Sequence, residues 1–416
     1  FYVSGSRSNA SGETYVAYLF AHDTASTGII QCGSFTTDAS GLVSLQTLGW
    51  EPQYILYKQY NGAFTSSWNI IDNIRGWSNT GDARLTANTS SAEVSDASNP
   101  NYCIPSATGF SFPTAGLLNN SAGYIYIAIR RPNKPPTSGT QVFSPVLGTF
   151  SGTTVTNTGF VVDLAINKNG TSSASNNFVL DRLRGSDNST AQQTISTNST
   201  SSEVASSGRV AITATNTTIQ NGFLEQDATS NNIIWVFKRA PGFFDEVCYT
   251  GTGSATTQAH NLTVVPEMMI VKWRSGGGVA SASWAVYHKD LGNDAALYLN
   301  LTLAKLSPYT GFWNNTSPTS SVFSIGNEIT TNYSAANYVA YLFATLAGIS
   351  KVGSYTGNGS TQTINCGFST GARFVLIKRT DSTGDWYTFD TARGMTVSTD
   401  PYLLLNSTAA ETATLG

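Results

Sequence analysis

The sequence predicts an all-β protein built of tandem β-sandwich modules, of the jelly-roll or lectin-like kind and about 105 residues each. Three observations predict this fold class. An apolar six-residue segment recurs, its starts separated by 109, 109 and 105 residues. The segments between these copies are short, rich in Val, Ile, Tyr, Phe and Trp, and bounded by Gly, Asn, Ser and Thr, which is typical of strands and turns. No stretch keeps apolar residues at helical spacing for long enough to predict a substantial helix.

Composition limits the function classes. The chain has 416 residues, 40% hydrophobic and 11% aromatic, so it can bury several cores. Charged residues make up 11%, well below the roughly 25% of ordinary globular proteins. The net charge of −3 comes without any Lys/Arg cluster, so we expect no nucleic-acid binding. No apolar run approaches the roughly 20 residues of a membrane-spanning helix, so we expect no membrane insertion.

The recurring apolar segment is the first of four repeated blocks. Its copies are residues 15–20, 124–129, 233–238 and 338–343. Aromatic and β-branched side chains dominate each copy, so the block predicts one buried strand per module.

Two further blocks also predict strands. A Gly-hydroxyl-aromatic block occupies residues 33–36, 148–151 and 353–356, with a looser copy at 248–251. A block ending in lysine occupies residues 54–58, 269–272 and 374–378. The last copy is almost continuously apolar, which indicates an inner strand.

The fourth block contains the candidate site residues. It holds the tryptophans Trp68, Trp284 and Trp386, which lie four residues before Asp72, His288 and Asp390. An Asp-x-x-Arg-Gly element supplies the pairs Asp72 with Arg75, Asp181 with Arg184, and Asp390 with Arg393, and it has degenerated around His288. One interpretation is a turn in which the Asp accepts backbone N–H groups and the Gly takes a positive φ. The alternative is a repeated site for a sugar hydroxyl or a cation, with the tryptophans stacking on the sugar instead of filling the core.

An Asn-Glu block follows each Asp-x-x-Arg element. Asn88, Asn198 and Asn406 each precede two hydroxyl residues, and Glu93, Glu203 and Glu411 lie five positions on from them. The third copy has Asn300 and Lys305 instead. Glycoside hydrolysis needs two facing carboxylates, and a pair such as Asp390 with Glu411 is lost where His288 and Lys305 replace it. We therefore expect no catalytic residues and no enzyme activity.

Metal and cofactor sites are also not expected. The cysteines Cys32, Cys103, Cys248 and Cys366 form no CxxC pair, and we interpret them as small buried hydrophobic residues in preference to disulfides. The three histidines share no metal-ligand spacing.

The phase of the repeat divides the chain into five parts. Three modules are whole, at residues 28–139 (including a linker), 140–240 and 241–345. Residues 1–27 match the last strands of a module, and residues 346–416 match its first part. Either the two part-modules are pieces of a longer array, or they complete each other by strand donation, within one chain or between chains.

Four longer motifs connect the chain to a known group. They are residues 130–136, 238–245, 265–272 and 385–394. With these motifs the sequence resembles the repeat-containing virion structural proteins of marine tailed bacteriophages, notably cyanophage-like ones. The resemblance covers most of the chain and implies a tail fibre, appendage or coat protein, located in the virion or outside the cell. It implies no active site.

These observations lead to three functional hypotheses. The first is a structural component whose partners are other copies of itself or other virion proteins. The second is an adhesin that binds cell-surface glycan through several weak sites. The third is a polysaccharide depolymerase. Fold class alone does not choose among them.

Overall fold

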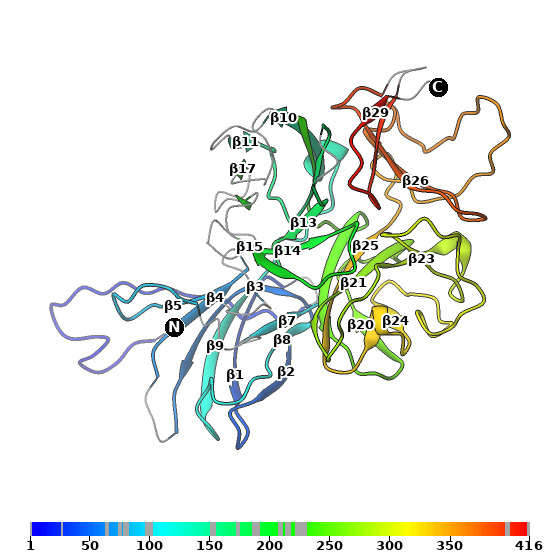
Figure 1. Cartoon of the computed structure of the whole chain (residues 1–416). Coiled ribbons are helices and arrows are strands. Elements are labelled where there is room, and N and C mark those ends of the chain that lie inside the picture. The colour runs from blue at the N-terminus through cyan, green and yellow to red at the C-terminus, as the bar shows by residue number, and fades with distance from the viewer. Residues whose placement is uncertain are drawn as a thin grey trace.

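The chain forms a series of antiparallel β-sheets in a computed structural model (Figure 1). The structure describes residues 2–25, 28–62, 66–73, 77, 83–95, 103–149, 155–171, 175–184, 192–206, 211–212, 218–220, 231–395 and 400–413. Four β-rich units follow one another along these residues. We name them module 1 (residues 28–139), module 2 (140–240), module 3 (241–345) and module 4 (346–416).

Module 1 is a two-sheet sandwich. Its large sheet has the order β1-β9-β3-β4-β5-β6, made of β1 (Ile30–Thr36), β9 (Gly123–Arg130), β3 (Pro52–Gln59), β4 (Asn69–Asp72), β5 (Ala83–Thr86) and β6 (Val94–Ser95). Its small sheet has the order β2-β8-β7, made of β2 (Val43–Thr47), β8 (Gly109–Phe112) and β7 (Ile104–Ser106). The last strand, β9, lies between the first and the third.

Module 2 repeats this arrangement. A single 3-10 turn, η1 (Gly139–Gln141), precedes it. Its large sheet has the order β10-β18-β12-β13-β14-β15, made of β10 (Phe143–Thr149), β18 (Asn231–Phe237), β12 (Leu164–Asn169), β13 (Phe178–Asp181), β14 (Gln192–Ser196) and β15 (Val204–Ser206). Its small sheet has the order β11-β17-β16, made of β11 (Val155–Asn157), β17 (Thr218–Gln220) and β16 (Ala211–Ile212).

Module 3 has the same plan with fewer strands. Its large sheet has the order β19-β25-β21-β22-β23, made of β19 (Phe244–Thr250), β25 (Ala336–Phe343), β21 (Met268–Gly276), β22 (Ala285–His288) and β23 (Leu297–Tyr298). Its small sheet pairs β20 (Thr256–Ala259) with β24 (Val322–Ile325). The short helices are η2 (Lys289–Leu291) and α1 (Ile329–Asn332), so the expectation of no substantial helix is confirmed for the described residues.

Module 4 is one sheet in the order β26-β27-β28-β29. Its strands are β26 (Phe374–Lys378), β27 (Trp386–Asp390), β28 (Pro401–Leu404) and β29 (Thr412–Ala413). They correspond to the third strand and its successors in the other modules. The described part of module 4 therefore contains no partner strands for the free edge of β26.

Modules 1 to 3 each have an apolar interior on the inner face of their large sheet. Phe35, Ile55, Tyr57, Phe110 and Phe112 lie in the interior of module 1. Phe160, Ala165, Leu180 and Val236 fill module 2, and Val271, Trp273, Phe323, Tyr338 and Ala340 fill module 3. The prediction of tandem β-sandwich modules is confirmed.

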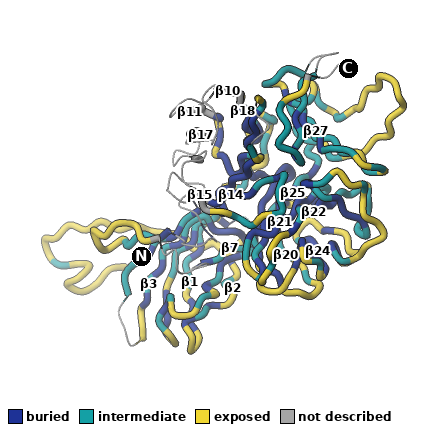
Figure 2. The backbone as a smooth tube through the Cα atoms, viewed as in Figure 1, coloured by how far each residue is buried: buried dark blue, intermediate teal, exposed yellow. Residues whose placement is uncertain are grey.

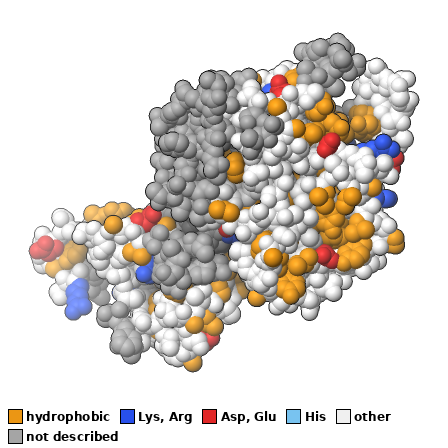
Figure 3. Space-filling view, in the orientation of Figure 1, with side chains coloured by type: hydrophobic (Ala, Val, Ile, Leu, Met, Phe, Trp, Pro, Cys, Tyr) orange, Lys and Arg blue, Asp and Glu red, His pale blue; other side chains and the backbone are white. Residues whose placement is uncertain are grey.

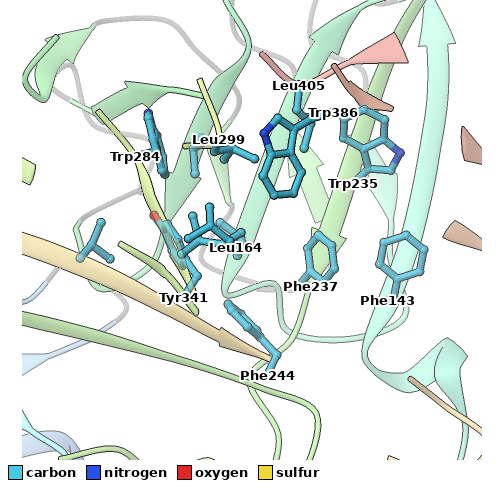
Figure 4. Close-up of a cluster of buried hydrophobic side chains, with 14 of the residues drawn as sticks. Phe143, Leu164, Trp235, Phe237, Phe244, Trp284, Leu299, Tyr341, Trp386 and Leu405 are labelled. Carbon is cyan, nitrogen blue, oxygen red and sulfur yellow. The ribbon is translucent and has the colours of Figure 1, made fainter. Parts of the chain in front are cut away.

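A fourth apolar cluster joins modules 2, 3 and 4. It is formed by the outer faces of their large sheets, the faces that point away from the sandwich interiors. Figure 4 shows the side chains that meet there, from module 2 (Phe143, Leu164, Trp235, Phe237), module 3 (Phe244, Trp284, Leu299, Tyr341) and module 4 (Trp386, Leu405). Full burial of a large apolar side chain stabilises by roughly 1.5–3 kcal/mol, so this shared core holds the three modules together as one body.

Two predicted strands are wrong. Residues 15–20 and 353–356 are irregular backbone in the structure, although the described residues of their copies in modules 1 to 3 lie in or at the end of β-strands. Tyr18 is 84% exposed and Tyr355 is 50% exposed. In the complete modules these two blocks pair with each other, as β19 pairs with β25. A strand without a neighbour leaves its backbone N–H and C=O groups unpaired. Residues 15–20 and residues 353–356 each lack the partner block, so neither segment forms a strand.

Completion of module 4 by residues 1–27 of the same chain is not observed. Residues 15–20 belong to the N-terminal part of the chain beyond β4 and β5, and β26 lies at the opposite end of the molecule (Figure 1). The described contacts of the N-terminal segment are with β1, where the Asp23 N–H donates to the Ile30 carbonyl over 2.9 Å.

Candidate functional site

The Asp-x-x-Arg element of module 2 is a buried turn directly after β13. One carboxylate oxygen of Asp181 accepts the backbone N–H of Arg184 over 2.8 Å, and the other accepts the Arg184 Nε. The guanidinium also donates to the Val179 carbonyl over 3.0 Å and to Glu203 Oε2 over 3.0 Å. Asp181 and Arg184 are fully buried, so neither presents a polar group to solvent.

Module 4 builds the same turn after β27. One oxygen of Asp390 accepts the backbone N–H of Arg393 over 3.0 Å, and the other lies 2.7 Å from Arg393 Nε. Arg393 also donates to Glu411 Oε2 over 3.2 Å. Gly394 follows at φ 92°, a conformation open to glycine at little cost.

Each of these aspartates also accepts a hydrogen bond from another module. Tyr341, on β25 of module 3, donates its hydroxyl to Asp181 over 2.6 Å. Trp235, on β18 of module 2, donates its indole N–H to Asp390 over 3.0 Å. Tyr341 and Trp235 occupy the same register position. Tyr341 lies two residues before the partner of Met268, the first residue of β21, and Trp235 lies two residues before the partner of Leu164, the first residue of β12. The two turns are therefore joints between modules.

Burial and charge act against each other at the module 2 turn. Burial alone would raise the pKa of the Asp181 carboxyl, but Arg184 and the hydrogen bonds outweigh burial and hold that pKa below its usual range. Burial, reinforced by the charge of Asp181, raises the pKa of the neighbouring Glu246 well above its usual range.

The third copy of the element has His288 in place of aspartate. His288 pairs with Met268, as Asp181 pairs with Leu164. Its Nδ1 accepts the backbone N–H of Asp290 over 3.2 Å, and burial lowers the pKa of its imidazole. Gly292 follows at φ 90°, so the turn keeps its shape although the buried ion pair is lost.

The element of module 1 is described only in part. Asp72 ends β4 opposite Tyr54, which is the position of the other three copies, and it is half-buried. Arg75 lies outside the described residues.

Side chains at the recurring tryptophan position form hydrogen bonds from each of modules 2, 3 and 4 to the next. The indole N–H of Trp284 in module 3 donates to the Ser196 carbonyl of module 2 over 2.9 Å. Trp386 in module 4 donates to the Tyr298 carbonyl of module 3, also over 2.9 Å. Module 2 has Asn177 at this position, and its side chain donates to the Leu405 carbonyl of module 4 over 2.9 Å.

These contacts define a closed ring of modules 2, 3 and 4, which we call the three-module ring. Trp284 and Trp386 are 1% and 3% exposed, so neither presents a stacking surface to solvent. Trp68 of module 1 is half-buried and lies outside this ring.

Three lysines repeat the same cycle, and the sequence alone predicted no role for them. Lys272 and Lys378 end copies of the lysine block, and Lys168 has the matching position on β12. Lys272 of module 3 donates to the Thr200 carbonyl of module 2 over 3.0 Å. Lys378 of module 4 donates to the Thr302 carbonyl of module 3 over 3.0 Å. Lys168 of module 2 donates to the Ser407 carbonyl of module 4 over 2.9 Å.

Two of these lysines have strongly lowered pKa values. Burial lowers the pKa of Lys272 to about 7. Burial, with the charge of Arg393, lowers the pKa of Lys168 to about 8. Each also donates a second hydrogen bond inside its own module, Lys272 to the Ala282 carbonyl and Lys168 to Asn177. A neutral amine can supply both donors, so the ring needs no lysine charge.

Backbone hydrogen bonds also connect the three modules, and in each of them the module that accepts the side-chain hydrogen bond is the one that donates. The N–H of Glu203 in module 2 donates to the Arg274 carbonyl of module 3 over 2.8 Å. The equivalent donors are the N–H of Lys305, to Thr380 of module 4, and the N–H of Glu411, to Gly170 of module 2.

Side-chain bonds account for the recurring asparagine and glutamate. Asn88, Asn198, Asn300 and Asn406 each accept the backbone N–H of the residue at the tryptophan position of their own module, over 2.8 or 2.9 Å. Glu203 and Glu411 each bind the arginine of their own turn.

The candidate carboxylate pairs lie on either side of an arginine. In module 4 Arg393 contacts both Asp390 and Glu411, and in module 2 Arg184 contacts both Asp181 and Glu203. No group of three His, Cys, Asp or Glu side chains that could hold a metal ion occurs among the described residues. No disulfide joins any of the four cysteines, and Cys103 is buried while the other three are half-buried.

A second ion cluster joins module 1 to modules 2 and 3. Arg239, at the end of module 2, donates to Glu51 Oε1 of module 1 over 2.8 Å and to Asp245 Oδ1 of module 3 over 2.9 Å. Arg131 of module 1 lies 3.5 Å from the same Asp245 oxygen. A cavity of about 230 Å³ beside this cluster is lined by Leu45, Pro105, Leu183 and Val247, among others.

Comparison with known proteins gives one match. A family model described as "Domain of unknown function (DUF7483)" matches residues 1–132 and 239–415, so module 2 falls outside the matched residues. No curated protein and no solved structure matches the chain. No helix in the described residues has the length and apolarity needed to cross a bilayer.

Proposed function

We propose that this chain, which belongs to the DUF7483 family of unknown function, is a structural component of an extracellular assembly, namely a phage virion fibre, appendage or coat protein. The observation that carries the proposal is the shared core of the three-module ring. Outer sheet faces that would be open in an isolated module are covered by the neighbouring modules. The chain is thereby a rigid body of several modules, as a fibre or coat requires.

The candidate site residues support a structural role. Asp181, Arg184 and Asp390 are buried and hydrogen-bonded, and Tyr341 and Trp235 complete them from other modules. A ligand site needs polar groups that a ligand can reach. Groups already satisfied by the protein leave nothing to offer a sugar or a cation.

The surface is also consistent with this role. Uncharged side chains predominate on the face shown in Figure 3, with few Lys, Arg, Asp or Glu atoms among them. Large uncharged surfaces suit repeated contacts between identical copies, because like charges would repel in a symmetric arrangement.

The test is to locate the protein. We expect antibodies against the chain to decorate a projecting or coat structure of purified virions in immunogold electron microscopy, and mass spectrometry of those particles to detect it. Its absence from purified particles would reject the proposal.

The adhesin alternative has less support. It depended on repeated tryptophans that could stack on sugars, and Trp284 and Trp386 are buried between modules. Trp68 is the remaining copy with exposed surface. Binding of host surface polysaccharide that is lost in Trp68→Ala would favour the adhesin, whereas reducing-end release from polysaccharide would favour the depolymerase.

A further inference from the structure

We propose that the outer face of the large sheet of module 1, which we call the open face, is a trimerisation surface. The open faces of module 1 from three copies of this chain pack against one another. The three copies of module 1 then form a ring like that of modules 2, 3 and 4. The inference rests on the proposed structural role and names the partner, a second and a third copy of the chain.

The open face has the same register as the ring faces. Ile125 on β9 pairs with Lys58 on β3, as Ile233 pairs with Lys168 and Val339 with Lys272. Ile233 and Val339 are 0% exposed because other modules cover them, but Ile125 is 41% exposed. Equivalent positions therefore differ in burial because the covering modules are missing at module 1.

The open face is largely apolar. Its other apolar side chains are Leu56, Ile70, Leu85, Ile127 and Ile129, all of them half-buried. Along β3 these half-buried positions alternate with buried ones that point into the sandwich. Figure 2 shows this as alternating dark blue and teal in module 1, whereas the central strands of module 3 are mostly dark blue. Apolar patches of this kind on a soluble domain mark interaction sites.

The polar groups that connect the ring are also present at module 1. Trp68 has the position of Trp284 and Trp386, and its backbone N–H donates to Asn88 over 2.8 Å, as in the other modules. By register, its indole N–H would donate to the Thr86 carbonyl of the next copy, because Thr86 has the position of Ser196 and Tyr298. Lys58 has the position of Lys168 and Lys272.

The geometry of the contacts selects three copies. In the three-module ring the side chain at the tryptophan position of each module donates a hydrogen bond to a carbonyl of one neighbouring module. A carbonyl of the same module accepts the corresponding hydrogen bond from the other neighbour. Such a head-to-tail contact is heterologous, which means that the two modules use different surfaces. Repeating it forms a closed ring, and the rotation between successive units sets the number of units in that ring. Modules 2, 3 and 4 show that this rotation closes at three, so we infer a trimer and not a dimer.

The experiment is to measure the mass of the full chain in solution by light scattering and analytical ultracentrifugation. We expect three times the 44.1 kDa of one chain. Ile125→Glu places three carboxylates around the proposed axis and should yield a single-chain mass. The matched control is Val265→Glu, since Val265 is 47% exposed and belongs to module 3, not to the open face of module 1, and it should remain trimeric.

Circular dichroism and thermal unfolding distinguish dissociation from misfolding. Ile125 is exposed, so Ile125→Glu should keep the β-sheet spectrum and unfold cooperatively. A wild-type chain that is monomeric or dimeric, or an Ile125→Glu variant that stays trimeric, would overturn the inference. A monomeric chain that is found in virions would reject the trimer but support the proposed function. A trimeric chain that is absent from virions would support the trimer but reject the proposed function.

Discussion

Modules 1 and 3 carry the same repeat, and they differ in what covers the outer face of their large sheets. Val339 and Tyr341 on β25 of module 3 are buried against modules 2 and 4, whereas Ile125 and Ile127 at the matching positions of module 1 are exposed or half-buried. The sandwich interiors of both modules are equally closed. The comparison shows that the same sequence repeat can form a module inside the ring or a module outside it. Contacts between modules decide which polar groups of the repeat are buried.

The largest expected effect comes from breaking a buried turn of the ring. Arg184→Ala leaves the buried Asp181 without its cation, while Glu203 keeps its ion pair with Arg274. Removing one partner of a buried ion pair costs about 3–5 kcal/mol. Chemical denaturation should show that loss. The matched control is Arg379→Ala, because the Arg379–Asp381 pair is exposed and should contribute nothing measurable. Equal behaviour of the two variants would contradict a structural role for the turn.

The tryptophan position offers a direct comparison of the two modules. Trp284→Ala removes a buried side chain and should cost about 3–5 kcal/mol in unfolding free energy. Trp68→Ala removes a half-buried one, so the monomer should lose markedly less stability. An equal loss measured by denaturation at low protein concentration would mean that the module 1 face is already covered within one chain.

A smaller effect is expected from the hydroxyl that enters the module 2 turn. Tyr341→Phe keeps the ring in the shared core but removes the donor to Asp181, and leaving a buried acceptor short of a partner costs about 1–3 kcal/mol. Thermal unfolding of the variant should show a lowered midpoint. Tyr309→Phe, at an exposed tyrosine, serves as the control, and an unchanged midpoint for Tyr341→Phe would argue against the joint.

A change in the pH dependence of stability is expected at Lys272. Its pKa is lowered to about 7 by burial, whereas an unfolded lysine titrates near 10.4. Between these pH values the unfolded chain binds one proton more than the folded chain, so the stability contributed by Lys272 rises with pH. The slope is at most about 1.4 kcal/mol per pH unit.

A matched variant isolates this contribution. Lys272→Met keeps the stem and removes the titration. The stability difference between wild type and Lys272→Met should be constant below about pH 7 and should shift in favour of wild type from there to about pH 10. Denaturation at pH 6, 7, 8 and 9 measures it, and a difference that does not vary with pH would show that Lys272 stays charged in the fold.

Local patterns predicted much of the candidate site. The Asp-x-x-Arg spacing places the aspartate within reach of the backbone N–H three residues on, as Asp390 and Arg393 show, because a turn is a local structure. The partners from other modules were not predictable. Tyr341 lies 160 residues from Asp181, and nothing in the local sequence links the two. The recurring lysine could be found in the sequence, but its role could not be predicted, because the carbonyl that accepts its hydrogen bond belongs to another module.

The wrong predictions have the same physical origin. Residues 15–20 have the composition of a strand, yet they lack the neighbouring strands that pair with β9, β18 and β25 in the complete modules. Composition reports a preference for the extended conformation, but only pairing satisfies the backbone.

By itself the sequence determined that the protein is a repeat of β-sandwiches, because alternation of apolar residues, turn residues and the repeat period are all local or periodic signals. Only the tertiary structure decided that modules 2, 3 and 4 close into a ring around a shared core, that the polar groups of the repeat are buried in it, and that module 1 is left with an open face. The reason is that each of these properties depends on which sheet lies against which. That is set by packing between residues 70 to 240 positions apart, as in the contact of Lys168 with Ser407.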